Sequence, residues 1–535
     1  MFQLPRSQPF LRMFMSLEMS PPNLILINAN IVTLDPFCPR AVWVAVADDK
    51  IVATGPGKDW TDLRDKHTGI LDCGGKTVVP GFIDAHLHLV SYARSLVTPD
   101  LSPDKNVHSI SDIQSIIMNC SREKPSGHWI MGRGYNEFYL AEKRHPNRWD
   151  LDKAAPDHPV RLTHRSGHAH VLNSLALKLV GITRETGDPE GGIIERDLKS
   201  GEPTGLLYEM GDFLHDRIPA LTPAELEKGL QLADQELISL GVTSIQDASS
   251  RNKIEQWKLI KSWKKSGLLH PRVNLMMGIS AFQKKSENYA LNGLDPNQLR
   301  LGAVKIILDD TTGRLYPSQP ELNEIVFEVH KAGKQIAIHA LEDNAIKAAC
   351  KAIQYAIEKI PVKNHRHRIE HCSVCSPDLA CTIASLGITV VTQPAFIYFH
   401  GERYFETIPG EQLKYLYPLQ TLLNKGVNIA ASSDCPIVSP DPLIGIKTAM
   451  HRLNSTGEMV GGKEKIQPNA ALQLYTINAA RATFEEAIKG TITAGKLADM
   501  VVLNADPTQL TADEFRNLQV DMTIIGGKVV WEKNR

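Results

Sequence analysis

Short apolar segments alternate with longer helical segments through most of this chain, from residue 78 to residue 434. The apolar segments are rich in β-formers, and helical stretches such as 321–332 and 344–359 separate several of them. Strands that alternate with helices indicate a parallel sheet, and some eight such units close into a (β/α)8 barrel. We therefore predict an α/β fold with a TIM-like barrel over residues 81–484. The predicted strands cover residues 78–84, 242–246, 303–308, 335–339, 367–371, 388–392 and 427–432.

The two ends of the chain share a different pattern, of short β-rich runs with Gly and Pro between them. This pattern is typical of a small β-sandwich. We predict one such domain built from both chain ends, with residues 23–80 as its first part and 485–535 as its second. Within the barrel, residues 91–220 are rich in Gly, Pro, Trp and His, and we predict that they form an insertion over the barrel mouth.

The balance of charge argues against several classes of partner. Lys and Arg number 59 and Asp and Glu number 60, so no net field favours nucleic acid or an acidic membrane. No stretch has the apolar length of a transmembrane helix. We expect a small-molecule substrate and neither a nucleic-acid nor a membrane partner, and the sequence leaves a homo-oligomer open.

The cysteines and the N-terminal residues bear on the compartment. The eight cysteines show no disulfide pattern, and Cys372 and Cys375 lack the second pair that a zinc ribbon needs. Reduced cysteines fit the cytosol. The apolar run within residues 1–22 is broken by Arg12 and Glu18, unlike a secretory signal. We predict a cytoplasmic protein in which residues 1–22 form a disordered extension.

Two histidines follow the first barrel strand, in the run His86-Leu-His88. Alternate residues of a strand share a face, so both imidazoles are expected to point the same way. Two histidines on one face at a strand end can chelate zinc or a similar ion. The alternative is a chance pair in a chain with 19 histidines.

Lys305 lies inside the apolar strand Gly302-Ala-Val-Lys-Ile-Ile-Leu. A lysine in a buried strand is costly unless it is paired or modified. Carboxylation of the amine by CO₂ would resolve the cost and give two oxygens that can bridge two metal ions. A snorkelling or salt-bridged lysine is the alternative.

Three further polar residues each end a later strand. His339 ends Gln-Ile-Ala-Ile-His, His371 ends Arg-Ile-Glu-His, and Asp434 ends Ile-Ala-Ala-Ser-Ser-Asp. The active sites of such barrels lie at this end of the strands. Taken singly, each could be a structural histidine or a turn aspartate. Metal-competent side chains at the ends of successive strands are hard to obtain by accident, so the whole set predicts a metal site.

A set of ordered motifs surrounds these residues. They are Leu26-Ile-Asn-Ala-Asn, Val79-Pro-Gly-Phe-Ile-Asp-Ala-His-Leu-His, Val304-Lys-Ile-Ile-Leu-Asp, His339-Ala-Leu-Glu-Asp-Asn-Ala, Arg368-Ile-Glu-His, Ser432-Ser-Asp-Cys-Pro, Thr476-Ile-Asn-Ala-Ala and Gly490-Thr-Ile-Thr-Ala-Gly-Lys-Leu-Ala-Asp. In this order they resemble the amidohydrolase superfamily, specifically its YtcJ-like, N-substituted formamide deformylase-like (amidohydrolase 3) group. The chain departs from that pattern at Asp310 and Glu342, where the family often has Gly.

The resemblance implies a role for each residue of the set. His86, His88 and Asp434 would bind one divalent ion, His339 and His371 a second, and carboxylated Lys305 would bridge them. Zn²⁺ suits these ligands, in one or two copies, with Mn²⁺, Co²⁺ or Fe²⁺ as alternatives. Asp434 would also carry the proton in catalysis, and His168 would bind the substrate carbonyl oxygen.

The resemblance further implies a hydrolase that cleaves a non-peptide C–N bond, in an amide, formamide or related small molecule, through a metal-bound hydroxide. The same metal site could act on an ester or phosphoester instead. A third alternative is a protein with this fold and no catalytic activity, which retention of all the ligand positions disfavours.

Overall fold

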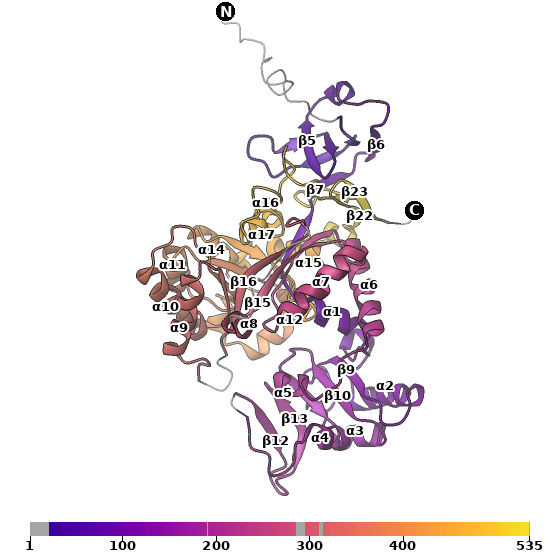
Figure 1. Cartoon of the computed structure of the whole chain (residues 1–535), viewed down its shortest axis with the longest axis vertical. Coiled ribbons are helices and arrows are strands. Elements are labelled where there is room, and N and C mark those ends of the chain that lie inside the picture. Colours follow the sequence, from indigo (N-terminus) through magenta and orange to yellow (C-terminus); the bar gives the residue numbers. More distant parts are fainter. Residues whose placement is uncertain (1–20, 190, 285–294, 310–313, 534–535) are drawn as a thin grey trace, which may run out of the picture.

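The computed structural model describes residues 21–189, 191–284, 295–309 and 314–533 (Figure 1). The prediction of a disordered extension over residues 1–22 falls almost wholly outside the described residues. None of the helices in the described part of the chain combines the length and the apolar character that a membrane span requires. All eight cysteines are free thiols.

Eight parallel strands with helices around them form the centre of the molecule, which confirms the predicted α/β, TIM-like barrel (Figure 1). Hydrogen bonds join the strands in the order in which they occur along the chain. The strands are β8 (Phe82–Leu87), β14 (Val242–Asp247), β15 (Arg272–Gly278), β16 (Leu299–Ile307), β17 (Ile336–Ala340), β18 (Arg368–His371), β19 (Thr389–Thr392) and β20 (Ile429–Ala431).

The segments that carry the predicted ligands join the first and last strands of the barrel at its mouth. The outermost strands β8 and β20 are not paired as a ladder. Beyond the end of β20, however, the Asp434 N–H donates to the His86 carbonyl and the His88 N–H donates to the Cys435 carbonyl, each over 2.9 Å. These two backbone bonds fix Asp434 beside both histidines.

The helix α6 (Pro223–Ser239) shows how local sequence forms the outer layer of the barrel. Thr222 and Glu225 form a capping box at its start, with Pro223 at the first position, where a missing N–H costs nothing. Buried residues Leu230 and Leu237 recur at helical spacing and pack toward β14. The helices α9 (Gln319–Lys331), α10 (Asp343–Lys359) and α11 (Pro377–Ser385) cover the other side of the barrel (Figure 1).

The two chain ends meet through β7 (Thr77–Pro80) and β21 (Met500–Leu503), which pair antiparallel. They belong to a six-stranded sheet that packs with a four-stranded sheet from residues 24–72 around a common apolar core. Gly81 lets the chain pass from this domain into the barrel, because a Cβ there would lie 2.3 Å from the Thr243 hydroxyl oxygen.

The sheet of the insertion lies at the opposite end of the molecule from the sandwich (Figure 1). Its five strands come from within residues 91–220 and lie in the order β12-β13-β11-β10-β9, where β9 covers Ile130–Tyr135, β12 covers Ile193–Arg196 and β13 covers Pro203–Tyr208. The helices α2 (Ile110–Glu123) and α3 (Arg148–Ala154) share a hydrophobic core with one of its faces. The strands used below are β10 (Val160–His164) and β11 (Ala169–Leu172).

Candidate metal centre

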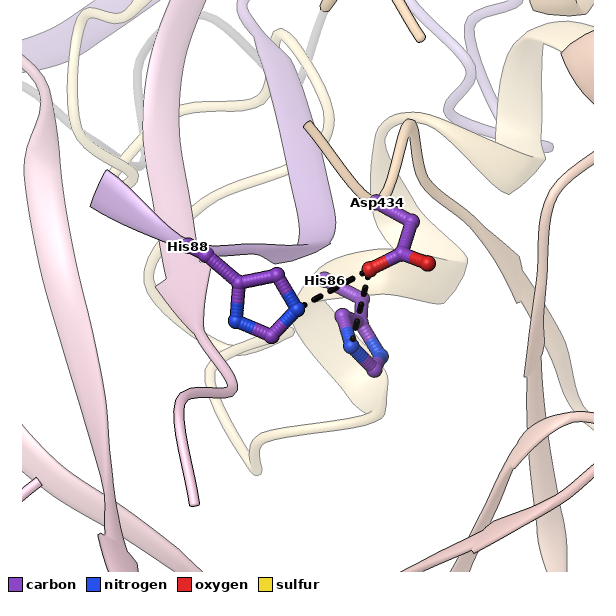
Figure 2. Close-up of side chains that lie close together, drawn as sticks. All are labelled: His86, His88 and Asp434. Atoms are coloured by element: carbon purple, nitrogen blue, oxygen red, sulfur yellow. Dashed lines mark hydrogen bonds and ion pairs between the residues drawn. The ribbon is translucent and has the colours of Figure 1, made fainter. Parts of the chain in front are cut away.

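Three side chains converge at the barrel mouth (Figure 2). His86 lies on β8, His88 directly follows β8 and precedes α1 (Leu89–Leu96), and Asp434 lies beyond β20. One potential ligand atom from each lies within 4.8 Å of the others. The Asp434 Oδ1 is 3.0 Å from the His88 Nε2 and 3.4 Å from the His86 Nε2. The three predicted ligands of one ion are therefore neighbours.

His339 and His371 lie beside these three. The ring centroids of His371 and His86 are 5.0 Å apart, and those of His371 and His339 are 4.3 Å apart. His371 Nδ1 donates to the Oε1 of Gln393 over 2.9 Å, which leaves Nε2 with its lone pair free for a ligand. His371 and Asp434 both have left-handed φ angles, of 76° and 57°. Such strain in residues other than glycine gathers at functional sites.

Lys305 comes from β16 and is 1% exposed. Its Nζ atom is buried and has no hydrogen-bond partner in the described part of the chain, so it neither snorkels to solvent nor forms an ion pair. Burial lowers the pKa of the Lys305 ammonium to about 8, although the carboxylates of Glu370 and Asp434 favour its charge. The lowered pKa makes the neutral amine, the form that reacts with CO₂, more accessible than in an ordinary lysine.

The surroundings of these side chains favour the protonation states in which they can bind a metal ion. Burial lowers the pKa of His86 to about 3, and it lowers the pKa values of His339 and His371 as well, so these imidazoles are neutral. Burial opposes ionisation of Asp434, but the hydrogen bond with His88 and the nearby His86 and His371 hold its pKa well below the usual range.

Two residues of this site were not predicted from the sequence. Glu370 Oε2 lies 2.5 Å from the His86 Nδ1, and Arg368 Nε donates to the Glu370 Oε1 over 2.7 Å. Both are fully buried and lie two residues apart on β18, so they share a face. The signal was available in Arg368-Ile-Glu-His, since two charged residues in a short apolar strand need a buried partner.

His168 lies in the loop between β10 and β11. Its side chain is half exposed, and its Nδ1 is 2.9 Å from the Oε2 of Glu209. The bond with Glu209 raises the pKa of His168, and the charges of Asp309 and Asp434 add to this effect. A Cβ on the adjacent Gly167 would lie 3.9 Å from the side chain of Ile437, so the loop rests against the segment that follows Asp434.

Comparison with known proteins agrees with this geometry. The model of the Amidohydrolase family matches residues 69–531. The chain is 30% identical to the N-substituted formamide deformylase of Arthrobacter pascens, over 96% of this chain and 98% of that protein. It is 29% identical to the putative amidohydrolase YtcJ of Bacillus subtilis, over 92% and 97%. An uncharacterized metal-dependent hydrolase from Pyrococcus furiosus superposes with a TM-score of 0.70 at 25% identity, over 91% of this chain and all of that structure.

Proposed function

Because this chain belongs to the amidohydrolase family of metal-dependent hydrolases, we propose that it cleaves a non-peptide C–N bond of a small molecule, in an amide, a formamide or a related group. The observation that carries the proposal is the convergence of His86, His88 and Asp434 at the barrel mouth, with Lys305 buried and unpartnered beside them. The formamide deformylase relative supports the choice of bond.

The residues present fit a divalent metal site. His86, His88 and Asp434 offer two nitrogens and an oxygen for one ion, and His339 and His371 offer nitrogens for a second. Lys305 carries no hydrogen bond that carboxylation would break. We propose that its carbamate bridges the two ions. Zn²⁺ suits this mixed nitrogen and oxygen set.

A divalent ion at such a site supplies a nucleophile at neutral pH and polarises the substrate carbonyl. The chain's own residues handle the proton and the orientation. Asp434 is ionised, and its carboxylate would accept the proton of the attacking water and return it to the leaving nitrogen. His168, whose Nδ1 bonds to Glu209, would donate a hydrogen bond to the carbonyl oxygen of the substrate.

The test combines metal analysis with a substrate panel. We expect the purified protein to carry one to two divalent ions per chain, and chelation to abolish hydrolysis of at least one compound among N-formyl and N-acyl amines, ureas and lactams. Added Zn²⁺, Mn²⁺ or Co²⁺ should restore the activity. His86→Gln should lose metal and activity, whereas the exposed His128→Gln should keep both.

Other outcomes would contradict parts of the proposal. Hydrolysis of matched esters or phosphoesters with no turnover of any amide would keep the metal site and change the bond. A metal-free preparation with full activity would refute the metal site. A protein that binds metal and turns over nothing in either panel would point to a non-catalytic role.

A further inference from the structure

Three arginines gather at the junction between the insertion and the barrel. Arg94 lies on α1, Arg161 on β10, and Arg251 in the segment that follows β14. Burial lowers the pKa values of Arg161 and Arg251, and neighbouring charges add to this effect, those of Arg94 and Arg251 on Arg161 and that of Arg94 on Arg251. His170 on β11 joins them, with its Nδ1 3.3 Å from an Nη of Arg161. We call these four residues the arginine cluster.

The arginine cluster has too few anionic partners. Within the described ranges, Arg251 is the one arginine of the three that forms an ion pair, with Asp212, whose side chain is 86% exposed. The Nε atoms of Arg94 and Arg161 and the Nε2 of His170 are buried without a hydrogen-bond partner. Partly buried cations that repel one another and leave donors unpaired are costly unless an anion joins them.

Two members of the cluster, His170 and Arg251, approach the same glycine. A Cβ built on Gly211 would lie 3.4 Å from the His170 Nε2 and 3.6 Å from an Nη of Arg251. Both nitrogens therefore lie beside Gly211, and this Nη of Arg251 is the one that pairs with the exposed Asp212. Gly211 begins the short helix α5 (Gly211–His215), which also carries Asp212.

The chain connects each part of the cluster to the metal centre. His170 lies two residues after His168. The pKa of His170 is lowered by burial and, to a lesser extent, by the charges of Arg161 and His168. The pKa of His168 is raised by its bond with Glu209 and, to a lesser extent, by the charge of Asp434. Two residues before Arg251, Ser249 has its hydroxyl 3.1 Å from the His88 Nδ1. Arg94 lies on α1, whose first residue follows His88. The members of the cluster are thus joined, through short stretches of chain, to residues beside the candidate metal centre.

We infer that the arginine cluster binds a carboxylate at the far end of the substrate, so that the preferred substrates are N-acyl or N-formyl derivatives of amino acids. The planar guanidinium pairs with a carboxylate through two parallel hydrogen bonds, which a neutral group cannot replace. This inference rests on the proposed function, because it assigns the amide of the same molecule to the metal centre.

The test compares ligands that differ only in the carboxylate. N-methanesulfonyl ω-amino acids, from glycine to ε-aminocaproate, resist hydrolysis, and each has a neutral N-alkyl methanesulfonamide of the same length. Isothermal titration of the metal-loaded protein measures the dissociation constants. At least one carboxylate should bind about tenfold more tightly than its neutral counterpart, or more tightly still, as expected for charged hydrogen bonds. The series of lengths covers the span between the two sites.

Two variants and a control test whether the arginine cluster causes this preference for the carboxylate. Arg161→Gln and the more exposed Arg251→Gln should each reduce it severalfold and leave binding of the neutral ligand unchanged. If Arg161→Gln fails to fold, Arg251→Gln decides the matter. Arg122→Gln changes an exposed arginine on α2 of the same insertion and should keep the full preference.

Equal binding of charged and neutral ligands at every length would overturn the inference, as would a preference that survives both cluster variants. Assays of hydrolysis with the matching acetamides test the proposed function separately from the carboxylate preference. Turnover of neutral acetamides without any carboxylate preference would refute the cluster's role and keep the hydrolase. Arginine-dependent binding without turnover of any amide would refute the hydrolase and keep the cluster's role.

Discussion

His86 and Glu370 form a buried pair in which the imidazole Nδ1 lies 2.5 Å from a carboxylate oxygen. Burial opposes the charge of Glu370, but Arg368 and His86 hold its pKa well below the usual range, so the carboxylate is ionised and accepts the Nδ1 proton. The Nε2 of His86 is thereby left with its lone pair directed toward Asp434. Such carboxylate partners fix the tautomer and orientation of metal-binding histidines.

Glu370→Gln should therefore weaken both metal binding and the fold. We expect metal affinity to fall about 10- to 100-fold, the usual effect of losing such a partner. Arg368 would be left buried without its counter-charge, which costs about 3–5 kcal/mol. Metal titration and thermal unfolding measure the two effects. The exposed Glu358→Gln on α10 serves as control, and unchanged values for Glu370→Gln would show that His86 needs no carboxylate.

Lys305→Ala should lose bound metal and nearly all activity, because no other described side chain supplies the two bridging oxygens proposed for its carbamate. Acetate or propionate should restore part of the activity, since a short acid can enter the vacated space. Elemental analysis and rate measurements on one preparation test this. The exposed Lys258→Ala on α7 (Ile254–Ser266) should behave like wild type, and a fully active Lys305→Ala would remove the bridging role.

Asp434→Asn should retain much of the metal and lose about 10²–10⁴-fold in kcat, the usual contribution of general acid–base catalysis. The amide keeps the size of the side chain and can offer an oxygen to the metal, but it is too weak a base to accept the proton. Metal content and kcat are measured together, with the exposed Asp378→Asn on α11 as control. Normal turnover at full metal content would exclude Asp434 as the proton carrier.

His270 gives the fold a pH dependence away from the metal centre. Its Nδ1 lies 2.7 Å from the Oδ2 of Asp234 on α6, and this bond raises the pKa of His270 despite partial burial and the charge of Lys264. Because the pKa of His270 is higher in the folded protein than in the unfolded chain, its charged pair with Asp234 stabilises the fold. This stabilisation is complete below the pKa of about 6.5 in the unfolded chain and is lost as pH rises through the pKa in the folded protein.

The melting temperature of His270→Gln should accordingly fall below that of wild type at about pH 6 and approach it at about pH 8. The comparison is made by thermal unfolding across this range. His108→Gln, which changes an exposed histidine of the insertion, should follow wild type at every pH. A difference for His270→Gln that grows with pH would reverse the sign and refute the charged pair.

Local sequence determined the alternation of strands and helices, the positions of His86, His339 and His371 near strand ends, and the position of Lys305 inside a strand. These depend on residue periodicity and on the direction of parallel strands, which short segments carry by themselves. In the structure His371 lies beside both His86 and His339. Their roles as metal ligands stay predictions.

Local sequence did not predict the strand β15 or the residues that pair with the proposed ligands, because both depend on tertiary structure. The strand β15 begins with Arg272, which is buried and pairs over 2.7 Å with Asp499 of the C-terminal part, 227 residues along the chain. The pairing of His86 with Glu370 likewise spans 284 residues. Neither partner can be read from local periodicity, because a buried charge is tolerated only where folding delivers its counter-charge. The arginine cluster has the same origin, since only the docking of the insertion against the barrel brings its three cations together.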